Sequence, residues 1–124
     1  MNVLYVMAGA VVGAPLRYLV GRAVTEAVGT RFPAGTLAVN LTGCFLIGIL
    51  GTLAIERDAL SREARLLLIT GVLGSYTTFS AFGFETYDLL RGGDVPRALV
   101  NAVGSVVAGV LAVWAGAIVT RFAT

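Results

Sequence analysis

The stretch GVLGSYTTFSAFGFE, residues 71–85, decides how this chain is built. Two glycines are followed by a run of serine, tyrosine and threonine side chains, with two phenylalanines set among them. Hydroxyl-bearing and β-branched residues beside glycine disfavour the interior of a helix. The sequence on either side is nevertheless apolar enough to lie in lipid. This stretch therefore predicts a helix that is broken near the middle of a membrane.

The composition of the whole chain is that of a membrane protein. Hydrophobic residues make up 57% of the chain and charged residues only 13%, whereas soluble domains carry about 25% charged residues. A helix needs about 20 mostly apolar residues to cross a bilayer. The 124 residues therefore predict one domain, residues 1–124, of four membrane-crossing helices joined by tight loops, with no separate soluble domain.

Charges and turn residues divide the chain into four apolar segments. Ser61 and Asp94 stand where helix caps are expected, and Pro96 suits the first turn of the last helix. Gly9 and Gly13 are spaced four apart, and glycines also recur in the second and fourth segments, which favours close helix packing in lipid. The predicted fold is an all-α membrane protein with approximate spans at residues 2–24, 34–55, 64–90 and 95–122.

Composition also excludes several classes of function. The chain has no histidine, and Cys44 is its only cysteine, so histidine-based catalysis, an intrachain disulfide and a Cys/His metal site are excluded. A net charge of +2, spread over the chain, is too small to indicate binding of nucleic acid. The first residues lack a positive segment, so we expect no cleaved signal peptide. We expect a protein that is not an enzyme.

The arginines give almost no preferred orientation. With four spans both termini lie on one side of the membrane, and orientation normally follows an excess of Lys and Arg in cytoplasmic loops. One interpretation is a weakly biased protein that something else orients. The other is insertion in both orientations, with assembly into antiparallel dimers. One side carries Arg57, Arg62, Arg65 and Arg121, and the other carries Arg22, Arg31, Arg91 and Arg97, with Arg17 inside the first helix.

The predicted break suggests two kinds of ion contact. Backbone carbonyls freed in an interrupted membrane helix can coordinate a small cation. Phe79 and Phe82 are three residues apart, so they share a face of a helix that resumes after the break. Phenyl rings have electropositive edges, and two edges aimed at one point would suit a small anion. The alternative is that both phenylalanines are ordinary core or lipid-facing side chains.

Polar residues at membrane depth are costly unless they find partners. Thr36 and Asn40 are four residues apart in the second segment, and Asn101 and Ser105 are four apart in the fourth, so each pair shares a helix face. These pairs either hold helices together by hydrogen bonds or supply donors to an anion. The Asn40 amide, with two N–H groups, is the stronger candidate for a donor.

Two charged residues within the apolar segments have alternative interpretations as well. Arg17 either extends to the interface or attracts anions from an aqueous vestibule. Glu85 lies near the end of the third segment, where an acid at the membrane interface is expected.

Three stretches resemble the Fluc/CrcB family of small membrane fluoride channels. They are GAPLRY at residues 13–18, GTLAVNLTGCFLIG at residues 35–48, and GVLGSYTTFSAFGFE at residues 71–85. The TTFS-x-F run together with GT-x3-N-x2-G is quite specific, and the likeness extends over all four segments. The resemblance implies an antiparallel, dual-topology homodimer with two fluoride pathways lined by both subunits, and a structural sodium ion at its centre.

The resemblance also implies roles for individual residues. Sodium would be held by backbone carbonyls of Gly74 and Thr77. The family typically has tyrosine where Asn101 stands, and sometimes serine where Gly109 stands, so the track on the fourth helix departs from the family pattern. The implied fluoride pathway consists of Phe79, Phe82, Asn40, Thr36, Ser80, Ser105, Asn101, Arg17 and Glu85.

The expected function is a passive channel that exports fluoride across a prokaryotic cytoplasmic membrane. One alternative is a small multidrug transporter, which would need a carboxylate within the membrane for proton coupling. The first segment has no acid before Glu26, which counts against that alternative. Another is a structural subunit whose polar residues only join helices.

Overall fold

The computed structural model describes residues 1–29 and 31–124, and in these residues the chain is helical without any strand. Four of its helical stretches are long and apolar enough to cross a membrane. The prediction of an all-α, multi-pass membrane protein is therefore confirmed. The stretches are Asn2–Val28, Ala34–Ile55, Arg62–Arg91 and Val95–Ala123.

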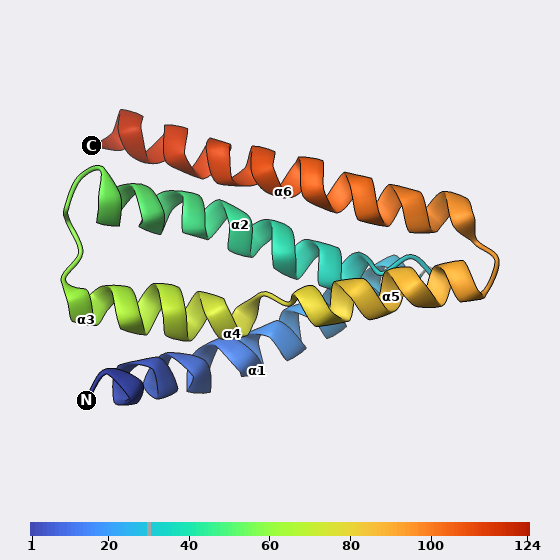
Figure 1. Cartoon of the computed structure of the whole chain (residues 1–124), viewed down its shortest axis with the longest axis horizontal. Helices are drawn as coiled ribbons and strands as arrows, with labels where there is room; N and C mark the ends of the chain where they lie inside the picture. Colours follow the sequence, from blue (N-terminus) through green and yellow to red (C-terminus); the bar gives the residue numbers. More distant parts are fainter. Residues whose placement is uncertain (30) are drawn as a thin grey trace.

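The third stretch is assembled from several pieces. Between its two halves, Thr77 has φ −82° and ψ 158°, and Thr78 has φ −149° and ψ 118°, which are extended conformations. Figure 1 shows this segment as a thin ribbon between α4 and α5. The Thr78 hydroxyl then accepts a hydrogen bond from the Ala81 N–H and so caps the next helix. The pieces are α3 (Arg62–Ala64), the π-helix η1 (Arg65–Leu73), α4 (Gly74–Tyr76) and α5 (Phe79–Arg91).

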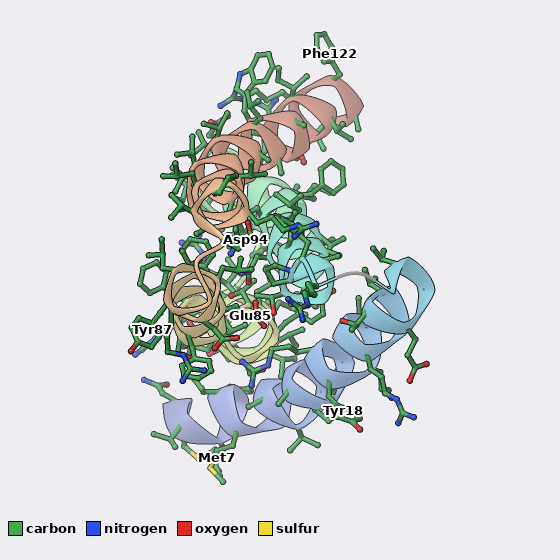
Figure 2. All side chains as sticks on the ribbon, turned by 90° about the vertical axis from the view of Figure 1, so that its right-hand side faces the viewer. Met7, Tyr18, Glu85, Tyr87, Asp94 and Phe122 are labelled. Carbon is green, nitrogen blue, oxygen red and sulfur yellow. The ribbon has the colours of Figure 1, made fainter. Side chains whose placement is uncertain are left out.

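The helices pack as two main pairs. α1 (Asn2–Val28) lies against η1, and α2 (Ala34–Ile55) lies against α6 (Val95–Ala123). Both termini are at the same end of the molecule, and α2 runs between α6 and the third span (Figure 1). α1 and α6 form opposite sides of the chain (Figure 2). The small buried core consists of Val39, Leu73 and Tyr76, while many large apolar side chains face outward, as lipid permits.

Glycines allow the backbones of both pairs to approach closely. A Cβ added at Gly9 would lie 2.7 Å from the Gly71 Cα, and one at Gly48 would lie 2.9 Å from the Val113 carbonyl carbon. The close contact predicted for the first helix is therefore confirmed. A Cβ at Gly104, by contrast, would meet no described atom within 4 Å, so this glycine has no packing role inside the protomer.

The ends of the helices agree with the sequence signals in most places. Ser61 caps α3 by accepting from the Ala64 N–H, and Asp94 caps α6 by accepting from the Arg97 N–H. The first helix is longer than predicted, because it continues past Val24 to Val28.

Local contacts explain the longer first helix. Arg22 and Glu26 pair one turn apart at 2.7 Å, and the Thr25 hydroxyl donates to the Gly21 carbonyl at 2.8 Å. Gly29, with φ 64°, then ends the helix in the left-handed conformation that glycine adopts without strain.

The packing of α2 on α6 predicts different effects for two nearby glycines. We expect Gly48→Ala to lower the free energy of unfolding by about 1–3 kcal/mol, because the added methyl group is forced against the Val113 backbone. Gly51→Ala, on the same helix but with nothing within 4 Å, should leave stability unchanged or slightly higher. Thermal unfolding of both variants in detergent measures the difference. Equal effects would contradict the close contact.

Candidate functional site

Two hollows meet at the extended segment of the third span. The first, of about 450 Å³, is lined by Arg17, Thr36, Thr78 and Ser80 among others, and we call it the arginine hollow. The second, also of about 450 Å³, we call the phenylalanine hollow. Thr78 lines both, so the two hollows adjoin at the extended backbone. The phenylalanine hollow is lined by Asn40, Gly74, Thr77, Phe79, Phe82 and Ser105 among others.

Asn40 fixes the extended backbone from the second span. Its Nδ2 donates to the Thr78 carbonyl at 3.0 Å, and its Oδ1 accepts from the Thr78 N–H at 2.9 Å. One side chain thereby satisfies both backbone groups of an extended residue, which lipid would leave without partners. The helix-joining role that the sequence left open for Asn40 is present. One of the two amide N–H groups remains available for another acceptor.

Two neighbours of Asn40 contact the third span at the extended segment and at the residue before it. The Thr42 hydroxyl lies 2.8 Å from the hydroxyl of the buried Tyr76. A Cβ at Gly43 would press on the Thr77 side chain. Sequence reasoning missed Thr42 and Tyr76, although a tyrosine within an apolar run that must find a partner for its hydroxyl was a usable signal.

Phe79 and Phe82 form a contact pair on α5, as their spacing predicts. Their ring centroids are 5.6 Å apart and the ring planes are tilted by 43°. Phe79 is 83% exposed in the single chain, whereas Phe82 is half-buried. Both rings line the phenylalanine hollow, so a small ion there would meet aromatic groups on one wall.

The Glu85 side chain turns from α5 toward α2, and its place at the membrane interface stays a prediction. The Thr36 hydroxyl donates to its Oε1 at 2.7 Å, and its Oε2 is buried without a partner in the described chain. Figure 2 shows Glu85 pointing toward the centre of the protomer, while Met7 and Tyr18 point away. This orientation arises because Glu85 lies on the face of α5 that is turned toward Thr36 of α2.

The polar residues of α6 connect to α5. Asn101 is only 2% exposed, and its Nδ2 donates to the Thr86 hydroxyl oxygen at 2.8 Å. The Ser105 hydroxyl donates weakly to the Asn101 Oδ1 at 3.4 Å. Thr86 in turn donates to the Phe82 carbonyl at 2.8 Å. Sequence reasoning did not single out Thr86, because a threonine that bonds its own helix gives no distinctive pattern.

Arg17 is the arginine that lines the arginine hollow. It is half-buried, and within residues 1–29 and 31–124 no carboxylate lies within salt-bridge distance of it. Other arginines are neutralised close to their positions, in the pairs Arg22–Glu26, Arg65–Asp58, Arg91–Asp88, Arg97–Asp94 and Arg121–Glu56.

Two of these ion pairs keep a carboxyl at a helix end ionised. The hydrogen bond from Arg121 lowers the pKa of Glu56, and the hydrogen bonds from Arg97 lower the pKa of Asp94. Arg17 has no ion-pair partner of this kind in the described residues, although Glu85 bonds Thr36, which lines the same hollow.

The extended segment offers oxygen ligands for a cation. No cluster of acidic, His or Cys side chains suitable for a metal occurs in the described residues. Backbone carbonyls are available instead, because the Thr78 N–H bonds Asn40 rather than the Gly74 carbonyl. Likewise the Ala81 N–H bonds the Thr78 hydroxyl rather than the Thr77 carbonyl. Two carbonyls thus lose the donors that a continuous helix would give them.

Comparison with known proteins assigns the chain to a family. Residues 4–117 match the family described as "CrcB-like protein, Camphor Resistance (CrcB)". The chain belongs to the CrcB-like protein family. The family resemblance drawn from the sequence motifs is therefore confirmed.

Curated relatives match along almost the full length of this CrcB-like chain. A protein of Solibacter usitatus is 47% identical over 121 residues, covering 98% of this chain and 99% of the relative. One from Chloroflexus aurantiacus is 47% identical and covers 93% of this chain and 91% of its own length. One from Rhizobium meliloti is 47% identical and covers 97% and 96%. All three carry the name "Fluoride-specific ion channel FluC".

The hydrogen bond between the Thr42 and Tyr76 hydroxyls predicts a measurable effect on stability. We expect Tyr76→Phe to lower the free energy of unfolding by about 1 kcal/mol, since it removes the bond to Thr42 and keeps the ring. Tyr87→Phe is the matched control, because Tyr87 is 58% exposed and its hydroxyl makes no hydrogen bond within the described residues. Unfolding in detergent compares the two. A larger loss for Tyr87→Phe would contradict the role of Tyr76.

Proposed function

We propose that this chain is a passive, fluoride-selective ion channel. Membership of the CrcB-like family carries the proposal, and the relatives named as fluoride-specific channels support it. The two hollows that meet at Thr78 support the proposal as well, because their lining residues include a cation, hydroxyls, an amide and two phenyl rings.

The arginine hollow serves as the entrance to the pathway. Arg17 raises the local concentration of anions there. Fluoride is small and strongly hydrated, so it enters lipid depth only where donors replace its water. The Ser80 hydroxyl lines this hollow and is one such donor, and the second N–H of Asn40 is the next donor toward the phenylalanine hollow. Thr36 also lines the arginine hollow, but its single hydroxyl proton is donated to Glu85, so it presents only its oxygen.

The phenylalanine hollow provides weak binding in the narrow part of the pathway. The edges of Phe79 and Phe82 are electropositive, so they attract an anion without the strong hold of a charged donor. Weak sites favour release and therefore conduction. Ser105 lies on the α6 wall of the same hollow and supplies a hydroxyl beyond the rings.

The active form in this proposal is an antiparallel homodimer with two pathways. Support comes from the surface of the single protomer, where Phe79 is 83% exposed and Gly74 is also exposed. A partner in the opposite orientation would cover both. The near-equal division of arginines between the two ends is compatible with insertion in both orientations.

A structural sodium ion fits the oxygen ligands at the extended segment. The Gly74 and Thr77 carbonyls would hold it, and a hard monovalent cation suits neutral oxygen ligands. When bound, it would neutralise the partial negative charge of carbonyls that face each other across the dimer. It has no part in transport.

The proposed location is a prokaryotic cytoplasmic membrane, with fluoride leaving the cell down its gradient. Fluoride enters cells as the neutral acid and is trapped as the anion, so a pore relieves the load without an energy source. No step requires catalysis by this chain.

One observation favours a second candidate, a proton-coupled transporter. Glu85 is a carboxylate within the bundle with one buried oxygen free of partners, and proton-coupled carriers need such a group. A proton flux driven by a cationic drug, in vesicles without fluoride, would support this candidate and contradict the channel.

The deciding experiment measures fluoride efflux from liposomes with a fluoride-selective electrode. We expect efflux from wild-type protein, and at least a tenfold slower rate for Phe79→Ala and Phe82→Ile, because the aromatic edges are lost. Phe122→Ala is the matched control, since Phe122 is 88% exposed near the C-terminus. This variant should conduct fluoride at the wild-type rate. Undiminished efflux in both pathway variants would contradict the role of the rings.

Dual insertion predicts a mixed population of orientations. A reporter fused after Thr124 should be detected on both sides of the membrane in comparable amounts, because neither end has an excess of arginines. Ala59→Arg adds a cation to the exposed loop at the end that carries the termini and should shift the reporter to the cytoplasm. A single orientation in the unmodified chain would refute the antiparallel dimer.

A further inference from the structure

We propose that Thr86 is a positioning residue that fixes Phe82 in the pathway, and that Asn101 acts through Thr86 rather than on the ion. This inference rests on the proposed channel function. It is carried by a continuous set of hydrogen bonds from α6 to the backbone of α5, at 2.8 Å from Asn101 to Thr86 and 2.8 Å from Thr86 to the Phe82 carbonyl.

The direction of the protons in this set is fixed by chemistry. An amide Nδ2 is only a donor, so the Thr86 oxygen must accept from Asn101. The single hydroxyl proton of Thr86 then goes to the Phe82 carbonyl. Two donors aligned in series polarise each other and strengthen both bonds. The turn of α5 that carries Phe82 is thus attached to α6, and not only to its own helix.

Because Asn101 is buried, loss of its hydrogen bond to Thr86 would cost free energy. Asn101 is 2% exposed, so an Nδ2 without its acceptor would be stranded away from water. A threonine hydroxyl that bonds the carbonyl four residues earlier also tends to bend its helix. Both effects place the Phe82 backbone, and with it the ring, at one position relative to α6.

The two phenylalanines differ in how they are held. Phe79 is the first residue of α5, directly after the extended segment, and it is 83% exposed in the protomer. Phe82 is half-buried, and its carbonyl receives the Thr86 bond. The fixed ring of the pair is therefore Phe82, and its position depends on a contact that reaches α6.

The same geometry assigns Asn101 a different role from the one that the family resemblance implies. Its Nδ2 is bonded to Thr86, and its Oδ1 faces the Ser105 hydroxyl at 3.4 Å. Asn101 does not line the phenylalanine hollow, whereas Ser105 does. We therefore place Asn101 behind the wall of the pathway, as the residue that holds Thr86.

The test begins with the Thr86 hydroxyl. Thr86→Val keeps the shape and removes both hydrogen bonds, and we expect fluoride efflux to fall about tenfold. Thr86→Ser restores the hydroxyl and should return efflux to within about twofold of wild type. Thr120→Val is the matched control, because the buried Thr120 also donates to a carbonyl four residues earlier, at 2.9 Å, but far from Phe82. Its efflux should be unchanged.

A double-mutant comparison separates an indirect role from direct ion contact. If Asn101 acts through Thr86, Thr86→Val combined with Asn101→Ala is no slower than the slower single variant. If the fold-losses in efflux of the two single variants multiply in the double variant, the inference is overturned, because Asn101 would then act independently of Thr86.

A second readout reports on Phe82 without any flux. The protein is labelled with fluorophenylalanine, and the ¹⁹F signal absent from Phe82→Ile identifies this ring. We expect Thr86→Val and Asn101→Ala to shift or broaden that signal, and Thr120→Val to leave it in place. An unchanged Phe82 signal in both variants would refute the positioning role, even if either variant were unstable.

The two readouts distinguish failure of the inference from failure of the proposed function. Wild-type protein without fluoride efflux would contradict the channel, while the ¹⁹F signals would still test the attachment of Phe82. Normal efflux in both wild type and Thr86→Val would leave the channel intact and overturn the role of Thr86.

Discussion

The double hydrogen bond between Asn40 and Thr78 is the contact on which the rest of the site depends. An extended residue at membrane depth has an N–H and a carbonyl that lipid cannot satisfy, and each unsatisfied group costs several kcal/mol. One carboxamide on α2 satisfies both. Because the chain is allowed to leave the helix there, the third span can line two adjoining hollows and change direction before Phe79. The same step frees the carbonyls of Gly74 and Thr77.

The sequence predicted the architecture because the relevant signals are local. Hydropathy identified the four spans, and Ser61, Asp94 and Pro96 marked helix starts that the structure contains. The boundary after α1 was misplaced, because the Arg22–Glu26 pair extends the helix through polar residues that otherwise read as a loop. Composition alone cannot tell whether one such ion pair stabilises a further helical turn or whether the chain forms a loop there.

The site was predictable by residue type but not by partner. The spacing of Phe79 and Phe82 predicted their contact, and the polar residues of α2 and α6 were identified. Their partners were not, since a hydrogen bond between helices depends on the rotation and depth of both. Glu85 illustrates this, because its distance from the segment end suggested an interfacial acid, while the rotation of α5 directs it to Thr36. Thr86 gives no signal in sequence at all.

The Gly74 carbonyl, which lacks the donor that a continuous helix would give it, has a consequence for a newly made copy of the chain. Gly74 is exposed on the single chain and its carbonyl lacks the Thr78 donor, so in lipid a single copy would carry an unsatisfied oxygen, at a cost in free energy, until something covers it. If the cover is an oppositely inserted sibling, the rate of maturation follows the product of the two orientation populations. Copies of the more abundant orientation would then remain without a partner and become substrates for membrane quality-control proteases. Insertion in equal numbers of both orientations would minimise this loss.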